Sequence, residues 1–120
     1  LRTINEIMNI DAPLVSINSK VLEAVIVMTE KKYGCAIIVD IKKNIKGIVT
    51  DGDLRRSLKS DLLEANVTKI MRINPILVNK NTLVSSAINI MNKNSITSLI
   101  IAEKKKVLGI VNLKECLDNE

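Results

Sequence analysis

The sequence predicts an α/β (α+β) fold built from two β-α-β-β-α repeats, and three observations lead to it. One apolar pattern occurs twice along the 120 residues, offset by about sixty positions. Each copy carries apolar residues spaced three and four apart, which indicates a helix. Two short branched runs follow, as is typical of buried strands. A single copy is too small to bury its own sheet and helix faces. We therefore expect two lobes, residues 1–60 and 61–120, related by a pseudo-twofold axis and packed through their sheets.

Each copy contains the same predicted elements in the same order. A short opening segment precedes a proline and a brief extended stretch, and a helix follows for which Ser19 and Thr82 are the expected N-caps. Two strands joined by a polar turn come next, and a short helix ends the copy. The connector 59–66 is expected to be helical or extended. The opening segments, strands and short helices fall at 4–9, 14–17, 36–40, 45–50 and 54–58, and again at 67–72, 76–78, 98–102, 107–112 and 113–117.

Composition narrows the classes of function. Tyr33 is the only aromatic residue, so the core is aliphatic and the stacking platforms of single-strand nucleic-acid binders are missing. Cys35 and Cys116 lie far apart and the chain has no His, so we expect no metal site and two cysteines that fill apolar gaps. The net charge of +5 fits either a solvated basic surface or attraction for phosphate-bearing ligands. Nucleic acid is not an expected partner.

The chain shows no signal for export or membrane insertion. No apolar run approaches the ~20 residues that span a bilayer, and no signal peptide is visible. We therefore expect a cytoplasmic protein without a membrane partner. The sequence begins at Leu1 rather than Met, which indicates a piece of a longer protein.

The segment 47–56 carries the sharpest local motif, where a strand ends and a helix begins. Thr50 can offer a hydroxyl to a phosphate oxygen, and Asp53 can accept two hydrogen bonds from a ribose diol. Arg55 or Arg56 can add charge-assisted hydrogen bonds to phosphate. The alternative is local, with carboxylates that cap the helix and arginines that are solvated. Spacing alone favours this local interpretation.

The doubled pattern, with Gly-Ile-Val-Thr-x-x-Asp at the end of a strand, resembles a pair of CBS domains (a Bateman module) over essentially the whole chain. The resemblance implies a regulatory, non-catalytic module that binds an adenosine nucleotide or a related ligand in the cleft between repeats. Thr50 and Asp53 would contact phosphate and ribose, Ile48 would line the base, and segments of the second repeat would frame the ligand. With Arg55 added for its charge, the expected ligand-binding residues are Ile48, Thr50, Asp53, Arg55, Pro75, Ile76, Thr97 and Ser98.

The second corner of that cleft departs from the family pattern. It would use Asn112 and Glu115 where the first uses Thr50 and Asp53. It would be framed by the Ala-Pro pair at 12–13 and the Gly-Cys pair at 34–35. Asn112 can still form hydrogen bonds, but the Glu115 carboxylate is one methylene longer. We expect one competent site and one that is weak or empty.

A closer similarity involves the stretch 50–56 together with 96–98 and 108–111. These residues are similar to the C-terminal CBS pair of arabinose-5-phosphate isomerases, enzymes of Kdo and lipopolysaccharide synthesis. The similarity implies an attached catalytic isomerase domain and a regulatory nucleotide, either AMP/ATP-like or a CMP-sugar, with no catalytic cofactor. The stretch 50–56 also occurs in CBS pairs attached to sugar nucleotidyltransferases, so that parent is an alternative.

The sequence is compatible with three classes of function to different degrees. The leading hypothesis is the ligand-sensing module, which we expect to form a homodimer or a higher assembly because CBS pairs commonly stack. The second is a purely structural dimerisation module. A free-standing enzyme is disfavoured, since the chain has no His, no activated cysteine arrangement and no metal cluster.

Overall fold

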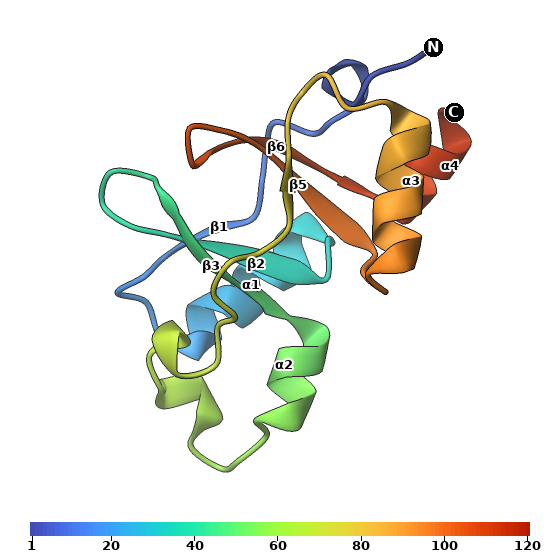
Figure 1. Ribbon diagram of the computed structural model, residues 1–120. Coiled ribbons are helices and arrows are strands. Elements are labelled where there is room, and N and C mark those ends of the chain that lie inside the picture. The colour runs from blue at the N-terminus through green and yellow to red at the C-terminus, as the bar shows by residue number, and fades with distance from the viewer. The chain divides into compact units, whose positions relative to one another are not determined.

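The computed structural model describes residues 1–120 as two three-stranded sheets with associated helices (Figure 1). The strand orders are β1-β2-β3 and β4-β5-β6. The strands are β1 (Leu14–Ser16), β2 (Cys35–Val39), β3 (Ile45–Thr50), β4 (Leu77–Val78), β5 (Ser98–Glu103) and β6 (Lys106–Asn112). The helices are α1 (Val21–Lys31), α2 (Asp51–Arg56), α3 (Val84–Lys93) and α4 (Leu113–Asp118), with 3-10 turns η1 (Ile4–Glu6), η2 (Leu62–Glu64) and η3 (Val67–Lys69). The predicted fold class and the β-α-β-β-α order are confirmed.

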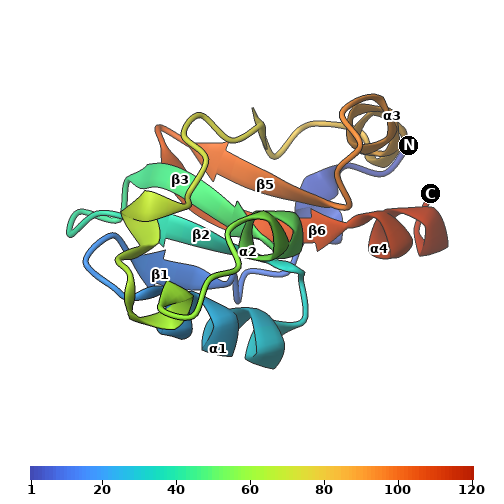
Figure 2. The ribbon, with the colours of Figure 1, turned by 90° about the horizontal axis from the view of Figure 1, so that it is seen from below.

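Each long helix connects two parallel strands. β1 pairs in parallel with β2, and β4 pairs in parallel with β5, so α1 and α3 are the crossovers that parallel pairing requires. The third strand of each sheet returns antiparallel through a tight hairpin. In Figure 2, α1 lies along its own sheet, where Ala24 and Met28 pack with Val15, Ile38 and Val49. The helical apolar face thus covers one face of the sheet.

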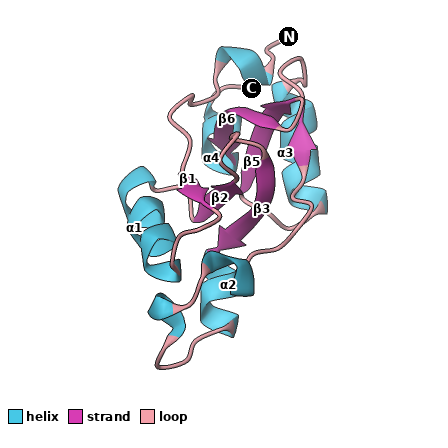
Figure 3. Cartoon of the chain, turned by 90° about the vertical axis from the view of Figure 1, so that its left-hand side faces the viewer, coloured by secondary structure: helices cyan, strands magenta, loops and turns pink.

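The duplication extends to the irregularities of the backbone. The β2–β3 register shifts between Ile38 and Val39, and the β5–β6 register shifts between Ile101 and Ala102. These positions are equivalent in the two copies, and both hairpins can be followed in Figure 3. The two copies therefore share a backbone conformation as well as a sequence pattern.

The compact units of the structure exchange their opening segments. One unit is residues 13–75, and the other combines residues 1–12 with 76–120. Ile4 is fully buried in the core that α3, β5 and β6 build, and Val67 is fully buried in the core that α1, β2 and β3 build. Each core is thus completed by the opening segment of the other copy. The predicted division of the sequence into repeats at 1–60 and 61–120 stays a prediction.

The predicted N-caps Ser19 and Thr82 are wrong. Lys20 and Leu83 occupy the cap positions, and neither forms a side-chain cap hydrogen bond. The reason lies in the exchanged segments. The Val21 N–H of α1 donates to the Ala65 carbonyl at 2.8 Å, and the Val84 N–H of α3 donates to the Arg2 carbonyl at 3.0 Å. Backbone carbonyls therefore accept hydrogen bonds from first-turn N–H groups. The side chain of a capping serine or threonine would otherwise accept these hydrogen bonds.

Other boundaries differ slightly from expectation. α2 begins at Asp51 rather than at residue 54, because Thr50 already caps it. The connector 59–66 contains the 3-10 turn η2, which confirms a partly helical connector. Cys35 and Cys116 are both buried, as expected for gap-filling cysteines. The longest helix, α1, has 11 residues, and no helix has the length and apolar character that crossing a bilayer needs.

Candidate functional site

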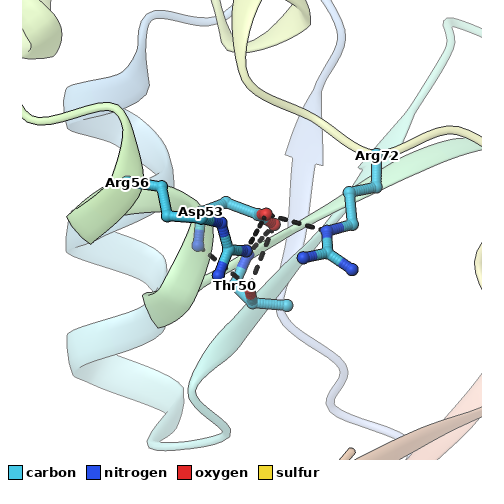
Figure 4. A network of polar contacts seen from close by, with 4 residues as sticks. All are labelled: Thr50, Asp53, Arg56 and Arg72. Carbon is cyan, nitrogen blue, oxygen red and sulfur yellow. Dashed lines mark hydrogen bonds and ion pairs between the residues drawn. The ribbon is translucent and has the colours of Figure 1, made fainter. Parts of the chain in front are cut away.

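The junction between β3 and α2 forms a reciprocal capping box. The Asp53 N–H donates to Thr50 Oγ1 at 3.2 Å, which satisfies one free donor of the first helical turn. In return Asp53 Oδ2 accepts the Thr50 N–H at 2.9 Å and the Thr50 hydroxyl at 3.0 Å. Figure 4 shows these contacts. The local interpretation of the motif, a capping aspartate, is therefore correct, and it fixes the carboxylate in one orientation.

Two arginines meet on the other oxygen of the same carboxylate. Arg56 Nη2 and Arg72 Nε each donate to Asp53 Oδ1 at 2.8 Å (Figure 4). Asp53 is only 6% exposed, whereas the Arg56 and Arg72 side chains are 60% and 61% exposed. A buried negative charge is thus paired with two cations that remain largely in water. Arg56 is therefore both largely solvated, as the local interpretation expected, and ion-paired with Asp53, while Arg55 is exposed on α2.

Arg72 reaches the site because its backbone is attached to the edge of β3. Its N–H donates to the Ile48 carbonyl at 2.8 Å, and the Ile48 N–H donates to the Arg72 carbonyl at 2.9 Å. Gly47 permits this approach, since a Cβ there would lie 2.7 Å from the Arg72 carbonyl oxygen. Sequence reasoning missed Arg72. The repeat does contain a signal for Arg72. Met71 matches Met8, so Arg72 is a charged residue at the position where the other copy has Asn9.

Burial and hydrogen bonding act on Asp53 in opposite directions. Burial by itself raises the pKa of the Asp53 carboxyl, because it disfavours the charged form. Hydrogen bonds from the Thr50 backbone, Arg72, the Thr50 hydroxyl and Arg56 outweigh burial and hold the pKa below its ordinary value. Asp53 is therefore an anion at neutral pH, able to accept hydrogen bonds but not to donate them.

The equivalent junction of the other copy keeps the capping box and has no arginine at either equivalent position. Asn112 Oδ1 accepts the Glu115 N–H at 2.7 Å, and Glu115 Oε1 accepts the Asn112 N–H at 2.8 Å. Asn9 bridges Ile110 as Arg72 bridges Ile48, but Asn9 Oδ1 accepts the N–H of residue 11. Three residues beyond Glu115 stands Asp118, where the first junction has Arg56. The two junctions share a backbone and differ in charge.

The remaining predicted residues are distributed over both compact units. The unit 13–75 contains Ile48, half-buried on β3, and Pro75, half-buried at its end. The other unit contains Ile76, Thr97 and Ser98. The Thr97 carbonyl accepts the N–H of residue 113 at 2.9 Å, and Ser98 begins β5. The structure therefore brings Thr50 and Asp53 into direct contact, with Ile48 on the same strand.

Comparison with known proteins gives a family match over nearly the whole chain. A family model of the CBS domain matches residues 4–60 and 67–119. A CBS domain pair solved in complex with 5′-methylthioadenosine and S-adenosyl-L-methionine superposes with a TM-score of 0.87 at 20% identity, covering 98% of this chain and 94% of that one. A hexameric CBS-CP12 protein from bloom-forming cyanobacteria gives 0.84 at 23% identity, covering 100% and 68%.

Among curated relatives, an arabinose 5-phosphate isomerase of Yersinia pestis is 36% identical over 109 residues. The aligned region covers 89% of this chain and 33% of the isomerase. The chain thus spans about a third of the length of that relative.

Proposed function

The chain belongs to the CBS domain family, and from this premise we propose that it senses a nucleotide through the Thr50–Asp53 junction. A CBS pair is a regulatory, ligand-binding module rather than a catalytic one. The observation that carries the proposal is a buried, ionised carboxylate held by a capping box beside two exposed guanidinium groups. This arrangement offers acceptors to hydroxyl groups and donors to phosphate within one small cluster.

The proposed contacts follow from the chemistry of each side chain. Asp53 accepts hydrogen bonds from the two ribose hydroxyls, and Thr50 Oγ1 turns toward a phosphate oxygen. Ile48, half-buried on β3, offers an apolar surface to the base. Arg55, exposed on α2, adds charge toward phosphate. The framing residues of the proposal are Pro75, Ile76, Thr97 and Ser98.

The ligand class is proposed to be adenosine-derived or a cytidine sugar nucleotide. The solved CBS pair that carries 5′-methylthioadenosine and S-adenosyl-L-methionine supports the first choice. The similarity to arabinose 5-phosphate isomerases supports a sugar-phosphate isomerase as the attached catalytic domain. In that arrangement the nucleotide would adjust the isomerase by binding its two conformational states with different affinity. A sugar nucleotidyltransferase remains the alternative parent.

A second candidate function is structural dimerisation. Leu22 and Ile26 lie one turn apart on α1 and are 40% and 41% exposed, and Leu63 on η2 is 44% exposed. The hexameric CBS-CP12 structure shows that a protein of this fold can assemble. Assembly through these apolar side chains needs no ligand.

Thermal unfolding with a panel of nucleotides separates the two functions. AMP, ADP, ATP, S-adenosylmethionine and a CMP-sugar would be titrated against the wild type and against Asp53→Asn, which keeps a capping acceptor. We expect at least one nucleotide to raise the melting temperature of the wild type and to have little effect on Asp53→Asn. A stable dimer whose melting temperature no nucleotide changes would support the structural function and contradict nucleotide sensing.

A further inference from the structure

We propose that Arg72 makes the Thr50–Asp53 site selective for ligands that carry a phosphoryl group. In the free protein Arg72 pairs with Asp53. When ribose hydroxyls occupy the carboxylate, the guanidinium leaves it and binds the ligand's phosphate. The inference rests on the proposed function, because it presupposes that a nucleotide binds here.

The Asp53 carboxylate has no vacant acceptor position. Its two oxygens accept four hydrogen bonds between 2.8 and 3.0 Å, two on each oxygen. An ionised carboxylate has about four lone-pair sites, so all are in use. A ligand hydroxyl can bind only by displacing one of these four donors.

The four donors differ in how easily they can leave the Asp53 carboxylate. The Thr50 N–H is part of the capping box, and removing it would open the first turn of α2. The Thr50 hydroxyl is not part of that box, and in the proposed function it turns from Asp53 toward a phosphate oxygen. The two guanidinium groups are about three-fifths exposed, so water can solvate them once they leave. The guanidinium groups are therefore exchangeable donors, as the Thr50 hydroxyl is.

Arg72 and Arg56 differ in how their backbones are attached to the site. Arg56 is on the helix that Asp53 caps, three residues away, so it stays beside the carboxylate in any exchange. Arg72 comes from a separate segment, and its backbone is held to Ile48 by two hydrogen bonds. Its guanidinium therefore pivots on a long side chain about a fixed backbone position.

Charge balance gives the exchange its selectivity. Asp53 with Arg56 and Arg72 carries a net charge of +1, from two cations and one anion. A phosphorylated nucleotide replaces the lost ion pair with a guanidinium–phosphate pair. A nucleoside takes the carboxylate and gives the displaced guanidinium no anion. Discrimination then arises as much from this penalty against the nucleoside as from attraction to the nucleotide.

The other copy provides an internal comparison. Asn9 and Asp118 occupy the places of Arg72 and Arg56, and the Asn9 side-chain oxygen accepts the N–H of residue 11. That junction has a carboxylate at Glu115 and no arginine at the two equivalent positions. Asn9→Ala is therefore a matched control, because it changes the equivalent position without touching the Asp53 cluster.

The test compares ligands that differ only in a phosphate. Dissociation constants would be measured by isothermal titration for AMP against adenosine and for CMP against cytidine, with 5′-methylthioadenosine as a further phosphate-free probe. The proteins would be the wild type, Arg72→Ala, Arg72→Gln and Asn9→Ala, each checked by circular dichroism. We expect Arg72→Ala to weaken nucleotide binding roughly 10- to 100-fold. Nucleoside binding should stay unchanged or become tighter, and Asn9→Ala should behave as the wild type.

Three results would overturn the inference. Equal weakening of nucleotide and nucleoside by Arg72→Ala and Arg72→Gln would show a merely structural role. No change in either would show that Arg72 does not take part, and tighter binding of 5′-methylthioadenosine than of AMP by the wild type would contradict phosphoryl selectivity. In all three the proposed function would survive. A wild type that binds none of the probes would instead overturn both proposals.

Discussion

Asp53 combines almost complete burial with a full set of hydrogen bonds, and its charge is therefore tied to folding. The carboxylate accepts from Thr50 twice and from Arg56 and Arg72 once each. A buried charge is tolerated only when such partners replace water. The local capping role and the proposed ligand role are therefore compatible, because the interactions that fix the cap also keep the carboxylate ionised.

Asp53→Asn is expected to destabilise the protein at neutral pH by about 1–3 kcal/mol, because two guanidinium groups lose their counter-charge. The lowered pKa means that folding favours the ionised form. Its contribution is present above the ordinary value of 3.8 and disappears as the pH falls through the folded-state pKa. The difference between wild type and variant in urea-unfolding free energy should therefore shrink below about pH 4.

Parallel pH curves for the wild type and Asp53→Asn would contradict that assignment. Some acid sensitivity will persist in the variant. The pKa of the Asp40 carboxyl is also lowered, chiefly by hydrogen bonds from Asn44 against a smaller opposing effect of burial. Asp40→Asn is the matched control for a half-buried carboxylate outside the Asp53 cluster.

Cys116 gives a second prediction at this scale. Burial, and then the nearby charge of Glu115, raise the pKa of its thiol to about 11. At pH 8 only about one thiol in a thousand would be ionised, so Cys116 should react very slowly with Ellman's reagent in the folded protein. In urea the reaction should become fast. Rapid labelling of Cys116 in the native Cys35→Ala variant would contradict its buried position.

At the scale of elements, the main structural feature that the two copies share is the contact of an opening segment with β3 or with β6. Gly47 and Gly109 admit these segments, since a Cβ would lie 2.7 Å from the Arg72 carbonyl oxygen at one position and 2.8 Å from Met8 Sδ at the other. The resulting bridges are Ile48 to Arg72 and Ile110 to Asn9. Small residues here are therefore a packing requirement.

Gly47→Ala should lower the free energy of unfolding by about 1–3 kcal/mol, because the backbone at Arg72 has to move. It should also weaken nucleotide binding, since Arg72 is displaced from Asp53. Gly109→Ala is the matched control, expected to cost similar stability while leaving the Asp53 cluster intact. Chemical denaturation and titration would be run on both. A Gly47→Ala variant with wild-type stability would refute the close approach.

Some elements could be predicted from the sequence and others could not. Helical spacing and branched runs located α1, α3 and the hairpins, because those patterns depend on residues close in sequence. The caps Ser19 and Thr82 were predicted wrongly because carbonyls of distant segments satisfy the helix donors. Arg72 was missed for a related reason. It contacts Asp53 across 19 residues, and only its pairing with Ile48 brings it there.

In the whole molecule, the opening segments of the two copies carry equivalent apolar residues. Ile4 matches Val67, Ile7 matches Ile70, and Met8 matches Met71. Either opening segment carries the apolar pattern that either core needs, so the sequence could not indicate which pairing occurs. In the structure each segment completes the core of the other copy.

Ile4→Ala tests this exchange of segments. Ile4 is fully buried among residues of α3, β5 and β6, so the substitution should cost about 2–5 kcal/mol. Ile10→Ala, at a position 79% exposed in the same segment, should change stability by less than about 0.5 kcal/mol. Native-state hydrogen exchange in Ile4→Ala should accelerate in α3 and not in α1. Acceleration confined to α1 would show that the segment packs with its own copy.

The most direct test of the account is whether nucleotide binding depends on Asp53 and not on Glu115. Isothermal titration would use whichever of AMP, ATP, S-adenosylmethionine and a CMP-sugar binds the wild type most tightly. We predict that Asp53→Ala abolishes binding while its circular dichroism stays native, and that Glu115→Ala retains most of the affinity. A folded Asp53→Ala variant with unchanged affinity would reduce Asp53 to a helix cap, and greater loss in Glu115→Ala would contradict the asymmetry between the two junctions.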